Sequence, residues 1–233
     1  MIRFQWPVFR LKICLYPVPC TLYPKLEIVP AIIADSYAEL EKQIRAVEPY
    51  VSLVHIDIMD GIFVPHKTVD GPAEIERLET KLELEIHLMV QKPENHIVRW
   101  LETRADKFLV HTESTSQFRK VIDFVREADR SIFAVLNPET AHSMLEPFIG
   151  DLDGVQFMTV HPGKHGAEFV EDIIKKIEDF HFYYPDMKIE VDGAIHEATA
   201  KQCVAAGASI LAVGSHIFLE NKDIGKAITE LQI

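Results

Sequence analysis

The sequence predicts a single α/β domain, a closed (β/α)8 barrel of the TIM type, that follows an N-terminal extension. From residue 28 onwards, short apolar runs alternate with amphipathic runs, and the pair recurs eight times. The chain has 233 residues, a common length for one such barrel. Side chains able to bind metals or move protons fall near the ends of the predicted strands, where barrels of this kind carry their active sites.

Short apolar runs rich in Val, Ile and Leu predict the parallel strands. They are residues 29–34, 53–59, 82–89, 107–112, 131–136, 155–160, 188–191 and 210–213. Alternation is clearest in the third strand, where Leu or Ile occupies every second position and would pack under the helices. The opposite face of this strand would point into the barrel, and it carries Glu83, Glu85, His87 and Met89.

Amphipathic runs between the strands predict the helices. Ser36 is placed to cap the first helix, with Glu39 at the capping-box spacing, and Pro72 stands near the start of the second. The predicted helices are residues 36–47, 71–80, 93–103, 116–127, 141–148, 166–180, 197–206 and 222–231.

Residues 1–27 differ from the rest of the chain, because four prolines and scattered basic residues interrupt every apolar run. These interruptions argue against a signal peptide and against a membrane span, so we expect a poorly ordered or loosely packed extension before a barrel domain of residues 28–233. Cys14 and Cys20 lie in the extension and Cys203 lies far from them, which provides neither a disulfide framework nor a zinc-finger spacing. A reducing, cytoplasmic setting fits this cysteine usage.

The formal net charge of −12 argues against a nucleic-acid partner, since phosphate backbones require patches of Lys and Arg. No membrane partner is expected either. A small anionic substrate is compatible with the composition because one pocket can be locally positive in an acidic protein. The sequence leaves a homo-oligomer open.

The chain is organised around residues 53–65, a predicted strand and the turn that follows it. His55 and Asp57 share one face because strand side chains alternate, and an imidazole beside a carboxylate can bind one divalent cation. Taken alone, the pair also fits an ordinary polar strand end. His87 and Asp192 lie near the ends of two further strands, and the four residues together form a suitable ligand set for Zn²⁺, Fe²⁺, Mn²⁺ or Co²⁺.

The two aspartates of this set suggest proton transfer. One carboxyl group can remove a proton from a carbon next to a carbonyl, and the other can return a proton to the opposite face. A metal between them would hold the substrate oxygens and stabilise the enediolate. We therefore assign catalytic roles to Asp57 and Asp192, with a direction that depends on the epimer bound.

Glycine-containing loops follow the sixth, seventh and eighth predicted strands, and they could bind a phosphate group. The first of these loops leads into a helix expected to begin at about Gly166, whose N-terminus would face the anion. Each motif is unspecific alone because tight strand–helix turns need glycine, but their placement at three successive strand ends predicts a phosphate site. Its residues are Gly163, Lys164, His165, Gly166, Gly193, Ala194, Gly214 and Ser215.

Met59, Met89 and Met158 also fall near strand ends. They are either core residues or an apolar wall over the reacting carbon, and the sequence does not distinguish these roles. His111 follows the fourth strand, and a structural histidine is the favoured interpretation there.

Several motifs in this chain occur in the order and at the spacing of a known family. They are residues 55–65 (His-Ile-Asp-Ile-Met-Asp-Gly-Ile-Phe-Val-Pro), His87-Leu-Met89, Leu136-Asn-Pro138, Pro162-Gly163 with Gly166 and Phe169, Glu190-Val-Asp192-Gly193, and Gly214-Ser215 with Phe218. Residues 29–218 thereby resemble the ribulose-phosphate 3-epimerase family.

The resemblance implies a ribulose-phosphate-binding barrel with one divalent metal ion bound by the four residues named above. It also implies acid and base roles for Asp57 and Asp192, and a substrate contact for His87. The expected activity is the interconversion of ribulose 5-phosphate and xylulose 5-phosphate in the pentose phosphate pathway, with a phosphorylated ketose as the partner.

The chain departs from the family pattern at three places. The family has Ser or Asn on the first strand, where alignment from Pro30 places Ala34. The phosphate loop Gly-Phe-Gly-Gly-Gln is replaced by residues 163–167, Gly-Lys-His-Gly-Ala, and the Gly-Gly after Asp192 is Gly193-Ala194. All four expected metal ligands are kept, so the departures concern the phosphate contacts, where Lys164 could supply a charge.

Three alternatives therefore stay open to different degrees. An epimerase of another ketose phosphate, such as allulose 6-phosphate, fits the altered loop. A non-catalytic sugar-phosphate or metal sensor fits the loop but not the two retained aspartates. The group of orotidine-monophosphate decarboxylase and hexulose-phosphate synthase would need an Asp-x-Lys-x-x-Asp pattern, and the second and third strands have no lysine at a matching place.

Overall fold

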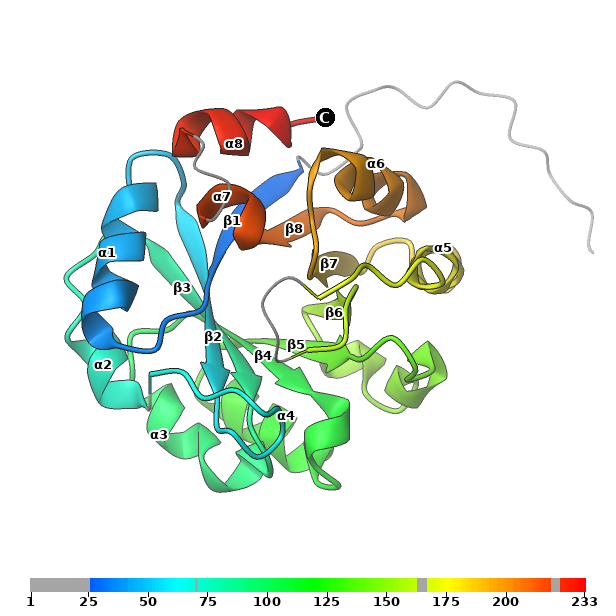
Figure 1. Cartoon of the computed structure of the whole chain (residues 1–233). Coiled ribbons are helices and arrows are strands. Elements are labelled where there is room, and N and C mark those ends of the chain that lie inside the picture. The colour runs from blue at the N-terminus through cyan, green and yellow to red at the C-terminus, as the bar shows by residue number, and fades with distance from the viewer. Residues whose placement is uncertain (1–25, 70, 163–166, 219–222) are drawn as a thin grey trace, which may run out of the picture.

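A computed structural model describes residues 26–69, 71–162, 167–218 and 223–233 (Figure 1). Eight parallel strands form one closed barrel in chain order, with β8 paired to β1, and helices lie around the outside. The predicted (β/α)8 barrel is therefore confirmed. Most of the predicted extension lies outside the described residues and stays a prediction.

The strands agree closely with the predicted ranges. They are β1 (Glu27–Ile32), β2 (Leu53–Met59), β3 (Glu83–Met89), β4 (Lys107–His111), β5 (Ser131–Leu136), β6 (Gly154–Met158), β7 (Lys188–Asp192) and β8 (Ile210–Val213). The strands β2, β5 and β8 span the predicted residues. The other strands differ by at most two residues at either end.

The helices agree less closely. They are α1 (Tyr37–Val47), α2 (Pro72–Glu76), α3 (Ile97–Leu101), α4 (Phe118–Glu127), α5 (Ile173–Tyr183), α6 (Glu197–Ala206), α7 (Ser215–Phe218) and α8 (Ile224–Glu230). The predicted cap of α1 is confirmed, because the Ser36 side chain accepts a hydrogen bond from the backbone N–H of Glu39 at 3.3 Å.

The helix predicted at residues 141–148 is wrong. The structure has two 3-10 turns there, His142–Leu145 and Ile149–Asp151. Pro147 accounts for the break, since it has no N–H to donate and its ring opposes continuation of a helix.

The start predicted for the next helix is also wrong. The helix α5 begins at Ile173, and residues 167–170 before it are not helical. There the backbone N–H of Val170 donates to the carbonyl of Thr159 at 2.8 Å, which holds the segment against the end of β6. The sequence did not predict α7, because four residues are too few to establish a helical period.

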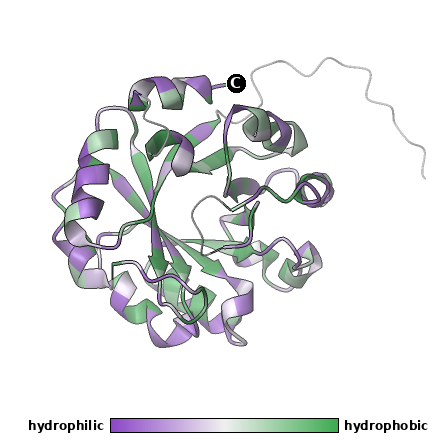
Figure 2. Cartoon of the chain, in the orientation of Figure 1, coloured by the Kyte–Doolittle hydropathy of each residue, from purple (hydrophilic) through white to green (hydrophobic). Residues whose placement is uncertain are grey.

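Hydrophobic side chains form two layers around the barrel wall, and Figure 2 shows the hydrophobic colour concentrated on the strands. The larger layer lies between strands and helices and includes the alternating Leu and Ile side chains of β3, as predicted. A smaller layer lies inside the barrel, with Phe133 and Leu109 among its members. No helix among the described residues combines the length and apolar character needed to cross a membrane.

Candidate active site

Two layers of polar side chains fill the middle of the barrel, and the strand register determines them. Asp57 on β2 is level with His87 on β3, while two residues earlier His55 is level with Glu85, which in turn is level with Lys107 on β4. Alternation directs all these side chains into the barrel. We call His55, Asp57, His87 and Asp192 the upper cluster, and Glu85, Lys107 and Glu190 the lower cluster.

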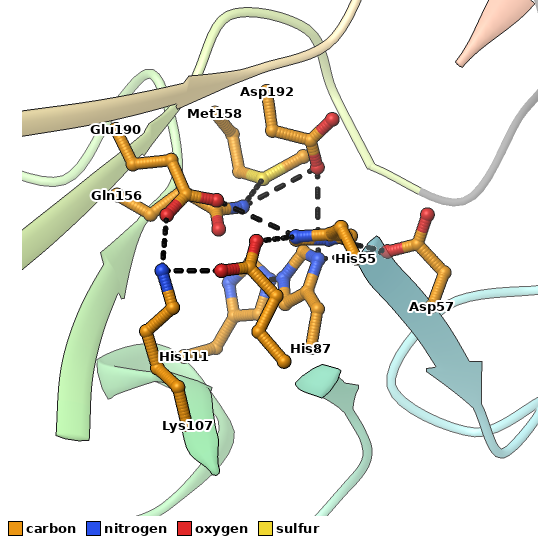
Figure 3. A network of polar contacts seen from close by, with 10 residues as sticks. His55, Asp57, His87, Lys107, His111, Gln156, Met158, Glu190 and Asp192 are labelled. Carbon is orange, nitrogen blue, oxygen red and sulfur yellow. Dashed lines mark hydrogen bonds and ion pairs between the residues drawn. The ribbon is translucent and has the colours of Figure 1, made fainter. Parts of the chain in front are cut away.

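The upper cluster brings the four predicted metal ligands together (Figure 3). The Nδ1 atom of His87 lies 2.8 Å from Oδ1 of Asp57 and 3.6 Å from Oδ2 of Asp192. The Nε2 atom of His55 lies 3.2 Å from the same oxygen of Asp57. One potential ligand atom from each of the four residues lies within 4.8 Å of the other three, and all four residues are buried. This cluster could bind a metal ion.

In each imidazole of the upper cluster, one ring nitrogen faces the two aspartates and the other, which we call the outer nitrogen, has a partner of its own. Nδ1 of His55 lies 2.7 Å from Oε1 of Glu85. Nε2 of His87 lies 3.0 Å from Nε2 of His111, whose Nδ1 lies 3.4 Å from Glu113. If every outer nitrogen carries its proton, His55 presents the lone pair of Nε2 and His87 presents that of Nδ1 to the centre. A carboxylate partner such as Glu85 orients a metal-binding imidazole.

The electrostatics of the two aspartates differ. Burial raises the pKa of Asp192 to about 8, and the negative charge of Asp57 adds to that rise. Burial acts in the same direction on Asp57, but the neighbouring His55 and His87 hold the pKa of that carboxyl well below its usual value. The cluster without a cation therefore favours one ionised and one protonated carboxyl group.

The two histidines differ as well. Burial lowers the pKa of His87 to about 4, although Asp57 opposes that change. Burial also disfavours a charged His55, but Asp57, Glu190 and Glu85 outweigh it and raise the pKa of His55 well above its usual value.

A cavity of about 520 Å³ lies above the upper cluster. Asp57 and Asp192 line it, whereas His55 and His87 are not among its lining residues. The structure thus places the two assigned catalytic carboxyl groups at the cavity, while the predicted substrate contact of His87 stays a prediction. The predicted apolar residues also line the cavity: Met59, Met89 and Met158.

The predicted phosphate residues divide into two groups. Gly193, Ala194, Gly214 and Ser215 all line the cavity. Gly163, Lys164, His165 and Gly166 lie outside the described residues, so their role stays a prediction. The prediction that a helix begins at about Gly166 and faces the phosphate with its N-terminus is wrong, because α5 begins only at Ile173.

The turn after β7 has an unusual backbone. Gly193 has a φ of +114°, and Ala194 has a φ of +49°, a left-handed conformation that non-glycine residues rarely adopt. A Cβ atom on Gly193 would lie 2.4 Å from Cγ2 of Val160, so close packing also requires a glycine at that position.

Ala34 is a further correction, because it is buried in the outer hydrophobic layer and does not line the cavity. The β1 residue that does line it is Ala31. Sequence reasoning also missed polar neighbours of the upper cluster. Nε2 of Gln156 lies 3.3 Å from Oδ2 of Asp192, and the lower cluster contacts His55. Alternation could have found Gln156, which lies two residues before Met158 on the same face.

Barrel and site together define an enzyme that binds a small substrate at the carboxyl ends of its strands. A profile of the ribulose-phosphate 3 epimerase family matches residues 27–218. The chain belongs to this family, and it is an isomerase of the epimerase type.

Named relatives agree along most of the chain. The ribulose-phosphate 3-epimerase of Bacillus subtilis (strain 168) is 34% identical over 215 residues, which cover 89% of this chain and 98% of the relative. The ribulose-phosphate 3-epimerase of Schizosaccharomyces pombe (strain 972) is 33% identical over 198 residues, with 82% and 86% covered. The chloroplastic ribulose-5-phosphate-3-epimerase of Arabidopsis thaliana is 35% identical over 208 residues, with 85% and 73% covered.

Solved structures of other enzymes share the fold. A 3-hexulose-6-phosphate synthase matches with a TM-score of 0.64 at 15% identity, covering 89% of this chain and 98% of that one. Orotidine 5'-phosphate decarboxylase from Pyrococcus horikoshii OT3 matches with a TM-score of 0.63 at 22% identity, with 88% and 97% covered. At such identities the likeness concerns the barrel alone, and β2 and β3 of this chain contain no lysine.

Proposed function

We propose that this chain interconverts D-ribulose 5-phosphate and D-xylulose 5-phosphate by proton transfer at C3. The observation that carries the proposal is the pair Asp57 and Asp192, which reach the same cavity from β2 and from β7 with pKa values shifted in opposite directions. The names of the relatives support the choice of substrate.

The shifted pKa values support one assignment of the first proton transfer. Asp57 is ionised and can act as the base, while Asp192 holds a proton near neutral pH and can act as the acid. Removal of the C3 proton produces an enediolate, and return of a proton to the other face inverts the carbon. In the reverse reaction the two carboxyl groups exchange roles.

The residues fit one divalent metal ion of the Zn²⁺, Fe²⁺, Mn²⁺ or Co²⁺ group. Burial and the charge of Asp57 raise the pKa of Asp192, and a bound cation would offset the repulsion between the two carboxyl groups. Two imidazole lone pairs complete a nitrogen and oxygen set that suits these metals. When bound, such an ion supplies electrostatic stabilisation of the negative charge that develops on the substrate oxygens.

The rest of the cavity would bind and shield the substrate. The side chains of Met59, Met89 and Met158 provide an apolar wall that keeps water from the enediolate. Gly193 and Gly214 have no side chain and allow the backbone to approach a phosphate, and Ser215 adds a hydroxyl group. Lys164 and His165 lie outside the described residues and stay predicted phosphate contacts.

The test is epimerisation followed by proton NMR in D₂O. We expect the wild-type protein to convert ribulose 5-phosphate and to place deuterium at C3. Asp192→Asn retains Asp57 and should exchange the C3 proton of only one epimer, whereas Asp57→Asn should exchange only that of the other. Exchange of both epimers by one single variant would contradict the two-carboxylate mechanism.

The same assay separates the alternatives. Turnover of allulose 6-phosphate but not of ribulose 5-phosphate would reassign the substrate. Binding of both compounds without exchange or turnover would indicate a non-catalytic relative. If ribulose 5-phosphate is still converted after complete removal of metal, the metal requirement is excluded, while the proposed roles of the two aspartates are not contradicted.

A further inference from the structure

The lower cluster is built around the ammonium group of Lys107 (Figure 3). Nζ of Lys107 contacts Oε2 of Glu85 and lies 3.2 Å from Oε2 of Glu190. The other oxygen of each carboxylate faces His55, since Nδ1 lies 2.7 Å from Oε1 of Glu85 and 3.4 Å from Oε1 of Glu190. Two buried carboxylates therefore bridge one ammonium group and one imidazole.

Without Lys107, the remaining three residues have the geometry of a second metal-binding set, which we call the lower set. His55, Glu85 and Glu190 each offer one potential ligand atom within 4.8 Å of the other two, and all three side chains are fully buried. The four residues of the upper cluster meet the same condition, and His55 belongs to both sets. The lower set differs because a positive charge of the chain itself already contacts both carboxylates.

The surroundings keep the ammonium group in place. Nζ of Lys107 lies 4.4 Å from the centre of the Phe133 ring, which closes the space around it. Phe133 can occupy this position because residue 154 is a glycine, whose Cβ would lie 2.4 Å from the ring. Lys107 is only 9% exposed, so water does not replace its ionic contacts.

We propose that the barrel interior contains two stacked cation sites that share His55, and that Lys107 permanently fills the lower one. Only the upper site then accepts a divalent metal ion, and His55 keeps Nδ1 toward the carboxylates and Nε2 toward that ion. The statement about the upper site rests on the proposed function, whereas the statement about Lys107 and the lower site does not. Without the ammonium group, two buried carboxylates would lack a counter-ion, and a divalent cation suits their oxygen ligands.

The test counts bound Co²⁺ in the whole protein by equilibrium dialysis, with visible absorption as a report on coordination. The variant Lys107→Met removes the ammonium group and keeps an apolar chain of similar length. The double variant Lys107→Met with Glu190→Gln also removes one carboxylate of the lower set. Lys120→Met is the matched control, since Lys120 also lies over an aromatic ring, at 5.6 Å from the centre of Phe124, but is exposed on α4.

We expect one Co²⁺ per chain in the wild type and in Lys120→Met, two in Lys107→Met with a changed spectrum, and one in the double variant. If Lys107→Met folds only with Co²⁺ and then binds two ions, the inference is also supported. A Lys107→Met protein that binds a single ion with the wild-type spectrum overturns it. So does one that stays unfolded in excess Co²⁺.

Failure of the proposed function has a different signature. If the wild-type protein binds no Co²⁺, the proposed metal site of the upper cluster is wrong. The lower site would still show itself, because Lys107→Met would then bind one Co²⁺ more than the wild type. The difference between variant and wild type therefore tests Lys107, and the wild-type count tests the upper cluster.

Discussion

The two polar layers of the barrel interior contain similar residues and differ in charge balance. In the lower cluster, Lys107 lies between two carboxylates, and although burial opposes the change, Lys107 and His55 lower the pKa of Glu85 to about 2. In the upper cluster no lysine or arginine contacts Asp57 or Asp192, among the described residues, and the pKa of Asp192 rises to about 8. A buried acid that keeps its proton near neutral pH supports the proposal that the upper layer is the catalytic one.

Substitutions of the two aspartates in the upper layer should have the largest effect on activity. Asp57→Asn and Asp192→Asn each remove one of the two proton carriers, so we expect kcat to fall by about 10²–10⁴-fold in either variant. Steady-state assays with ribulose 5-phosphate measure the effect. Asp123→Asn, on the exposed side of α4, is the control and should keep wild-type activity. Equal losses in all three variants would contradict the assignment.

Substitution in the lower layer should affect metal binding first. Glu85→Gln removes the charge that the outer nitrogen of His55 contacts, and such changes typically weaken metal affinity by about 10–100-fold. Competition with a coloured chelator measures the affinity. Activity should return at saturating metal, in contrast to the aspartate variants. Loss of activity that added metal does not restore would place Glu85 among the groups that act on the substrate.

The stability of the metal-free protein should depend on pH through Asp192. Its pKa is raised in the folded protein, so the folded state binds the proton more tightly than the unfolded state, and stability falls as the pH rises from about 4 to about 8 and levels off above that. Urea unfolding of chelator-treated protein above and below that pH measures the effect. Asp192→Asn cannot lose this proton, and we expect a flatter pH dependence. Identical slopes would refute the assignment.

The smallest expected effect lies at the rim of the cavity. Ala194→Gly relieves a left-handed backbone but adds freedom to the unfolded chain, so we expect a stability gain of at most about 1 kcal/mol. Ala198→Gly in α6 is the matched control and should destabilise by about 0.5–1 kcal/mol, since a helix disfavours glycine. Chemical denaturation that gives both variants the same sign would exclude strain at Ala194.

The sequence predicted the upper layer because its signals are local. His55 and Asp57 lie two residues apart on one strand, and His87 and Asp192 lie near the ends of two further predicted strands. The lower layer escaped prediction for the opposite reason. Lys107 and Glu190 are 83 residues apart, and only closure of the barrel brings them together.

Elements were predicted well where side-chain periodicity determines them, as in β2 and α6. Prediction failed where backbone chemistry interrupts the period. Pro147 breaks the expected helix after β5, and the segment before Ile173 is held by a backbone hydrogen bond to Thr159 that no side-chain pattern records. Ala31 lines the cavity and Ala34 does not because strand side chains alternate, which places Ala31 on the inner face and Ile32 and Ala34 in the outer layer.

The distribution of the upper cluster along the chain also has a kinetic consequence. β2 and β3 supply three of its residues, and β7 supplies the fourth, Asp192. The site for a cation bound by all four residues is complete only after β7 has joined the barrel. Contacts that form after the folding transition state slow unfolding and leave the folding rate nearly unchanged. We therefore expect a bound ion to prolong the lifetime of the native barrel without hastening its formation.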